Sequence, residues 1–218
     1  AWANYVYPID NRDDRRAVTM PPHALADVQR PRDFFANTPP VHGVAISPLI
    51  ADRDFKLQAR FDWQTGQEGV IVTLGDHFAG MSLFVRDGAL HFVYQLWHRP
   101  TELAPIALSP GTQDFVLHFR ALGDRRGQGD FTLNGVAVLA AVDLSPTLVR
   151  LPSGGLSVGI NRRQPVSHRY ADRGTFRYNG RIDRVRLEPG PQAPGTPMLI
   201  DEAAVQAAIR AAAGPSAV

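Results

Sequence analysis

The dipeptide Asp87-Gly88, set between two apolar segments, constrains the fold of this chain more than any other feature. Asp-Gly favours the two-residue turn of a β-hairpin, in which both central residues take a positive φ. A turn at this point places Arg86 opposite Ala89 and fixes one register for the two flanking strands. The apolar pairs expected on the inward face are Val85 with Leu90, Leu83 with Phe92 and Met81 with Tyr94, and the mixed pairs expected on the outward face are Phe84 with His91 and Ser82 with Val93.

The chain beyond Val41 continues as short apolar or alternating segments separated by turn residues, which is typical of a β-sandwich or barrel. In the segment 55–63 the polar residues alternate with apolar ones and are expected to face solvent. The charged stretch 161–178 is expected to be a solvated loop. Besides the central hairpin, strands are predicted over residues 41–46, 55–63, 68–74, 115–122, 131–138 with a turn at Asn134-Gly135, 154–160 and 180–187.

We therefore expect an all-β domain over residues 41–190, with extended segments at both ends. Residues 1–40 are rich in charge and proline, including Pro21-Pro22 and Pro39-Pro40, and are interpreted as an extended connector. Residues 191–218 begin as a proline- and glycine-rich linker and continue as an alanine-rich stretch, for which a short helix starting near Asp201 is predicted. The N-terminus has no basic and apolar leader pattern, so it is not expected to be a signal peptide, and it lacks an initiating methionine, so we expect a fragment, a processed chain or an expressed domain.

Composition narrows the classes of function. The hydrophobic content of 44% can supply a sizeable core, and the formal net charge of only +2 gives no indication of a nucleic-acid partner. The absence of cysteine excludes disulfides, thiol nucleophiles and cysteine-based metal sites, but leaves the compartment open. No apolar run approaches the roughly 20 residues that span a bilayer, so no membrane span is expected.

Four stretches resemble the C-terminal domain of a group of bacterial arylsulfatases. They are residues 75–95 with the central hairpin, Tyr7-Pro8-Ile9-Asp10-Asn11-Arg12, residues 127–138, and residues 176–185. The last stretch is also similar to the closing strand of laminin G-like and concanavalin A-like jelly-roll domains. The resemblance implies a concanavalin A-like jelly-roll sandwich of two antiparallel sheets. Asp76, Ala79 and Gln95 depart from the family pattern, in which glycines and an asparagine are common.

The resemblance further implies a non-catalytic accessory domain, which supports a sulfatase catalytic domain upstream of Ala1 or shapes its substrate entrance. The chain has no cysteine and no S-x-P-x-R motif for formylglycine, so it is not expected to hydrolyse sulfate esters itself. No cofactor is expected in this chain, whereas the parent catalytic domain would hold a divalent metal such as calcium. The alternative, from another class of function, is a lectin-like carbohydrate-binding module, and a homodimerisation domain is a third possibility.

Six residues are candidates for ligand binding. Trp63 and Trp97 could stack on saccharide rings, although tryptophan also serves as core or rim packing. Asp76 and His77 lie between Gly75 and Gly80 and could line a loop site, or simply form a loop. Arg162 and Arg163 could bind sulfate or phosphate, or belong to a solvated charged loop.

Catalytic residues and metal ligands are not predicted. The spacing of His91, His98 and His118 does not bring imidazoles together on one element. Asp52, Asp54, Asp124 and Asp130 are expected in loops, where a calcium ion is conceivable, but their spacing forms no calcium-binding motif. The paired acids of glycosidases on this fold, E-x-D-x-x-E, are absent from the sequence.

Overall fold

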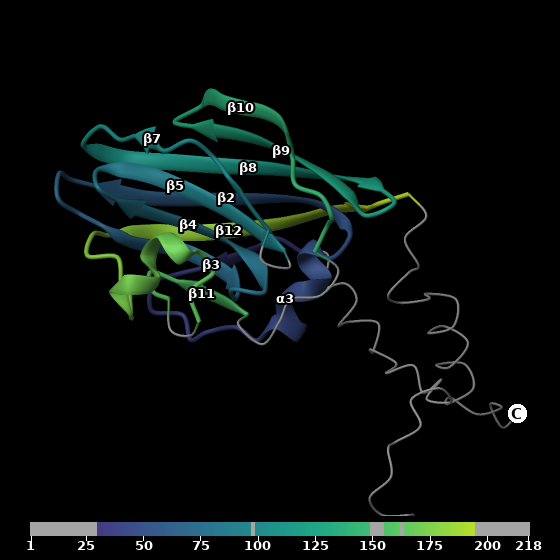
Figure 1. The fold of residues 1–218 in the computed structure, drawn as a ribbon, viewed down its shortest axis with the longest axis horizontal. Coiled ribbons are helices and arrows are strands. Elements are labelled where there is room, and N and C mark those ends of the chain that lie inside the picture. The colour runs from purple at the N-terminus through teal and green to yellow at the C-terminus, as the bar shows by residue number, and fades with distance from the viewer. Residues whose placement is uncertain (1–29, 97–98, 149–154, 162–163, 195–218) are drawn as a thin grey trace, which may run out of the picture. The chain divides into compact units, whose positions relative to one another are not determined.

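In the computed structural model, which describes residues 30–96, 99–148, 155–161 and 164–194, two antiparallel β-sheets pack face to face (Figure 1). These residues belong to one unit, Val28–Pro197. The elements in chain order are β1 (Arg32–Phe34), α3 (Gly43–Ile50), β2 (Arg53–Trp63), β3 (Gly69–Gly75), β4 (Ala79–Arg86), β5 (Ala89–Leu96), β6 (Arg99–Glu102), β7 (Ile106–Ala107), β8 (Gly111–Gly123), β9 (Arg126–Leu133), β10 (Val136–Asp143), β11 (Leu156–Val158), the 3₁₀ helix η1 (His168–Arg173) and β12 (Ile182–Gln192).

The two sheets are built from strands that are far apart in the chain. Sheet A has the order β1-β12-β2-β8-β9-β10, and sheet B has the order β11-β3-β4-β5-β6, with β7 also paired to β5. This arrangement confirms the predicted all-β sandwich of two antiparallel sheets. Among the described residues, no helix is long and apolar enough to cross a membrane.

The central hairpin has the predicted register. Asp87 and Gly88 both have a positive φ, 52° and 75°, as the tight turn requires. Every predicted pair is present between β4 and β5, from Arg86 with Ala89 to Met81 with Tyr94. The second predicted hairpin also forms, because Asn134 and Gly135 take the same left-handed conformation and join β9 to β10.

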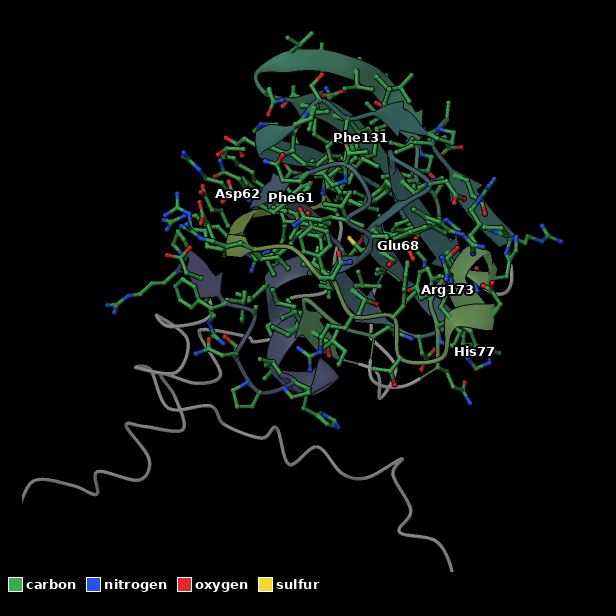
Figure 2. The ribbon with its side chains drawn as sticks, turned by 90° about the vertical axis from the view of Figure 1, so that its left-hand side faces the viewer. Phe61, Asp62, Glu68, His77, Phe131 and Arg173 are labelled. Carbon is green, nitrogen blue, oxygen red and sulfur yellow. The ribbon has the colours of Figure 1, made fainter. Side chains whose placement is uncertain are left out.

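Aromatic side chains from both sheets form the core between them. Phe92 of β5 lies 5.0 Å from Phe131 of β9 and 6.0 Å from Phe115 of β8, measured between ring centroids. Phe61 and Phe131 are fully buried inside the domain (Figure 2). Contacts of this kind remove large apolar areas from water and join the sheets without ion pairs.

The outer face of the central hairpin is also buried, which corrects the expected solvated loop over residues 161–178. Tyr170 of η1 and Phe176 form a second apolar cluster with Val70, Phe84 and Val93 on the outer face of sheet B. The Tyr170 hydroxyl lies 3.0 Å from Ser82 Oγ, so the mixed face of the hairpin has buried partners rather than water. We name residues 164–178 the outer strap.

The predicted first strand over residues 41–46 is wrong in all but its first residue. Val41 forms an isolated bridge to Leu156, and the chain then turns into α3. Ile46, Leu49 and Ile50 are buried together, and their spacing of three and four residues is that of a helix face. Arg53 closes the end of this helix by donating a hydrogen bond to the Pro48 carbonyl at 2.8 Å.

Residues 32–34, which lie within the predicted connector, form edge strand β1 on β12 and bury Phe34. The strand predicted over residues 180–187 runs to Gln192. Residues 1–29 of the predicted connector and the helix predicted from Asp201 lie outside the described residues.

Candidate functional site

The outer face of sheet A presents a regular array of polar side chains. In β2 the residues alternate between the buried core and the outer face, so Phe55 and Leu57 point inward while Lys56 and Gln58 point outward. The same alternation in β8 leaves His118 exposed between buried neighbours. The predicted alternation of residues 55–63 is therefore confirmed.

Strand register aligns four of these side chains across the sheet. Glu188 of β12 pairs with Lys56 of β2, Lys56 with His118 of β8, and His118 with Asp130 of β9. Adjacent strands lie about 4.8 Å apart, so the four residues form a straight row. We call Glu188, Lys56, His118 and Asp130 the polar row.

The polar row lies in a cleft of about 530 Å³. Arg120 adds a third basic group to it. The described residues that line the cleft are Asp54, Phe55, Lys56, His118, Phe119, Arg120, Asp130, Glu188, Pro189 and Gly190.

The acidic groups of the cleft are held in place by the domain itself. Asp54 Oδ1 accepts a hydrogen bond from the Ala121 N–H at 2.8 Å, and Asp130 Oδ1 accepts one from the Ala141 N–H at 2.7 Å. Asp130 Oδ2 also pairs with Arg120 Nη2 at 3.0 Å. These carboxylates are fixed acceptors rather than free acids, which suits recognition better than proton transfer.

Two basic groups are less engaged than the acids. The Lys56 ammonium pairs with Glu188 Oε1 at the long distance of 3.8 Å, and Glu188 is also bound by Arg186 Nε at 2.9 Å. The two carboxylates Glu188 and Asp33 raise the pKa of Arg186. His118 has no hydrogen-bond or ion-pair partner among the described residues. Lys56 and His118 can therefore donate to an incoming ligand while the neighbouring carboxylates accept from it.

A second, smaller cleft of about 350 Å³ lies at the opposite sheet and contains His77, one of the candidates predicted from the sequence. His77 belongs to the β3–β4 loop, and the buried Gln95 donates a hydrogen bond to its backbone carbonyl. His168 of the outer strap lines the same cleft, together with Pro100, Pro165, Val166 and Ala171. Asp76 does not line it, because its Oδ1 accepts from the Phe78 N–H at 2.9 Å and closes the loop.

Trp63, a further sequence candidate, does not line either cleft. Trp63 is 4% exposed, and its Nε1 donates to the Gln67 carbonyl at 3.0 Å, so its ring offers no open face for a saccharide. The predicted stacking role of Trp63 therefore does not fit its burial. Trp97, Arg162 and Arg163 lie outside the described residues.

Of the four aspartates predicted in loops, Asp52 and Asp124 do lie in turns, whereas the other two lie in strands. Asp54 lies within β2 and Asp130 within β9, and the backbone N–H groups named above already bind both. Asp52 Oδ1 accepts from the Thr147 hydroxyl at 3.0 Å. Across the described part of the chain, no group of three or more His, Cys, Asp or Glu side chains is placed to hold a metal ion.

Comparison with known proteins identifies the fold. No family model and no curated protein matches the chain. A solved structure of Ruminococcus gnavus IT-sialidase CBM40 bound to α2,3-sialyllactose matches with a TM-score of 0.50 at 10% identity, over 75% of this chain and 94% of that chain. A mouse laminin α1 structure, domains LG4-5, matches with a TM-score of 0.42 at 17% identity, over 73% of this chain and 39% of that one.

The chain folds as a jelly-roll sandwich. At these identities the likeness shows the fold alone. Nothing in the comparisons links the chain to an arylsulfatase, so the predicted jelly roll is confirmed while the sulfatase resemblance gains no support.

Proposed function

We propose that this jelly-roll domain is a non-catalytic carbohydrate-binding module that holds its saccharide on the polar row. The observation that carries the proposal is the alignment of Glu188, Lys56, His118 and Asp130 across four strands inside one cleft. Each saccharide hydroxyl both donates and accepts hydrogen bonds, so a row that contains donors and acceptors in fixed order matches its chemistry.

The rigidity of the row favours recognition of this kind. Asp130 is held by the Ala141 N–H and Glu188 by Arg186 Nε, so these two acceptors lose little conformational entropy on binding. A free ligand acid group would meet Lys56 and His118 as donors, and ligand hydroxyls would meet Asp130 and Glu188 as acceptors. The fixed carboxylates leave no free acid–base pair for hydrolysis among these residues.

The solved structure from Ruminococcus gnavus supports the proposal at the level of the fold, and its bound α2,3-sialyllactose supplies a practical first probe. Lactose is the same saccharide without its sialic acid residue. A difference in affinity between the two probes measures what the whole sialic acid contributes to binding, and the part of it that is lost on Lys56→Ala or His118→Ala is the contribution of these donors.

The test is isothermal titration calorimetry of the full chain with both saccharides. Lys56→Ala and His118→Ala should each weaken binding by about tenfold, because loss of one hydrogen bond between charged and polar groups costs roughly 1.5 kcal/mol. Arg60→Ala is the matched control, since Arg60 lies on the same face of β2 but pairs with Asp183 outside the cleft. Absence of saccharide binding, or binding that neither cleft variant weakens, would refute the proposal.

The accessory role in an arylsulfatase stays a prediction that rests on the sequence motifs. It shares with the present proposal the expectation of a non-catalytic domain. A sulfatase catalytic domain as partner, and the divalent metal of that domain, belong to this prediction alone.

A further inference from the structure

Strand β10 ends sheet A and is unusual among the edge strands of the domain. Its sequence, VAVLAAVD, contains no charged residue before Asp143. Val136 is 68% exposed and Leu139 is 39% exposed. An edge strand leaves one row of backbone N–H and C=O groups unpaired, and an apolar edge attracts another strand.

The other sheet edges carry the features that normally prevent such pairing. Edge strand β1 follows Pro31 and contains Arg32 and Asp33, and edge strand β6 contains Pro100 between charged residues. The outer side of β11 is covered by Val41, which exchanges backbone hydrogen bonds of 2.8 and 2.9 Å with Leu156. Prolines, charges and a covering segment protect three edges, whereas β10 contains no proline and has its one charge at its last residue, Asp143.

We propose that β10 pairs antiparallel with β10 of a second copy of this chain, so that sheet A continues across a two-fold axis. Antiparallel pairing of identical strands is self-complementary, which is the requirement for an isologous dimer. A register centred on Leu139 places Val136 opposite Val142 of the partner subunit. Asp143 then lies beyond the paired stretch, so apolar side chains meet apolar side chains and no carboxylate is buried.

The apolar character of β10 also determines which kind of strand can pair with it. A partner for β10 must be a strand of about seven residues without charge, because a charged residue opposite Val136 or Leu139 would lose water without gaining a counter-ion. Among the described strands at the sheet edges, β10 itself meets this requirement, whereas β1 and β6 do not.

Two irregularities in β10 set the strength of the association. Its register against β9 shifts on both sides of Leu139, and Ala141 has a φ of 53°. Such bulges twist an edge strand and shorten the stretch that can pair regularly. The dimer is therefore small in buried area and dissociates on dilution, as small interfaces do.

Sedimentation equilibrium of the full chain over a wide range of concentration tests the proposal. The average mass should rise from 23.9 kDa toward twice that value as concentration increases. The double variant Val136→Lys and Leu139→Lys should remain monomeric, because it places like charges across the two-fold axis and costs little in folding at exposed positions.

Leu122→Lys is the matched control, since Leu122 is also 39% exposed but lies in the interior strand β8. This variant should dimerise like the unmodified chain, and circular dichroism should show the same β content in all three proteins. A monomer at every concentration overturns the proposal. A dimer that survives both lysines in β10 also overturns it, because the contact would then lie on another surface.

Discussion

At the scale of single residues, His91 couples the fold to pH. It is 9% exposed, its ring stacks on Phe84 at 4.9 Å, and its Nε2 lies 3.3 Å from the Arg86 carbonyl oxygen. Burial lowers the pKa of His91, with the Arg169 charge acting in the same direction and the Asp87 and Glu102 charges against it. The folded protein therefore holds this imidazole neutral over part of the range in which the unfolded chain protonates it.

We predict that the free energy of unfolding falls as pH decreases through about 6.5, the ordinary pKa of histidine in an unfolded chain. Because the folded-state pKa lies below the unfolded value, the unfolded state binds more protons in this window, and the contribution of His91 is fully present only above it. Urea unfolding at a series of pH values measures the slope. His91→Gln should flatten the dependence between neutral and mildly acidic pH, and an unchanged slope would contradict the assignment to His91.

The polar row shows at residue scale what could be inferred without coordinates. Alternation in the segments 55–63 and 115–122 assigns Lys56 and His118 to the outer face from the sequence alone. Their alignment with Glu188 depends on pairing between β12 and β2, which are distant in the chain and separated by most of the domain. No local turn specifies that pairing, so the row could not be predicted.

At the scale of elements, the sequence predicts a strand or turn correctly where neighbouring residues determine its conformation, and fails where distant segments determine it. Both hairpins were predictable because Asp87-Gly88 and Asn134-Gly135 impose a positive φ on two consecutive residues, and the register follows from the turn. The helix α3 was missed because its apolar spacing appears only when Leu49 and Ile50 are considered together with Ile46, beyond Pro48. Local conformational requirements can be read from sequence, and packing between distant segments cannot.

The outer strap is the clearest example of such packing. Its charges suggested a solvated loop, yet Tyr170 is fully buried against sheet B while Arg86–Asp172 and Arg173–Glu68 pair at its surface at 3.1 and 2.8 Å. Figure 2 shows Arg173 beside Glu68 at this margin of the domain. The apolar anchor and the ion pairs both hold the outer strap, and their contributions differ in size.

We predict that the burial of Tyr170 contributes more to the stability of the outer strap than its ion pairs do. Tyr170→Ala should reduce the free energy of unfolding by about 3–5 kcal/mol, because it empties a buried aromatic site. Tyr170→Phe should cost about 1 kcal/mol through the lost hydrogen bond to Ser82. Arg173→Ala should cost at most about 1 kcal/mol, since its pair with Glu68 is solvent-exposed. Urea unfolding of the three variants ranks their free energies of unfolding. A larger decrease for Arg173→Ala than for Tyr170→Ala would show that ion pairs hold the outer strap.

At the scale of the whole molecule, the proposed saccharide site and the proposed β10 dimer together determine how many saccharides one assembly binds. The two-fold axis of an antiparallel β10 pair is perpendicular to the joined sheet, so the outer faces of both copies of sheet A point to the same side. The polar row lies on that face in each copy. A dimer would therefore present two saccharide sites to one surface, and the second site would bind at a raised effective concentration.

We predict that a dense layer of immobilised saccharide distinguishes the dimer from the monomer where a soluble saccharide does not. The unmodified chain should dissociate from the layer at least about tenfold more slowly than the variant carrying Val136→Lys and Leu139→Lys, because two sites must release together. Both proteins should bind the soluble saccharide with equal affinity, since the polar row is intact in each. Biolayer interferometry gives the dissociation rates, with Leu122→Lys as the dimeric control. Equal rates for a dimer and a monomer that both bind soluble saccharide would contradict the prediction that the dimer engages the layer through two sites at once.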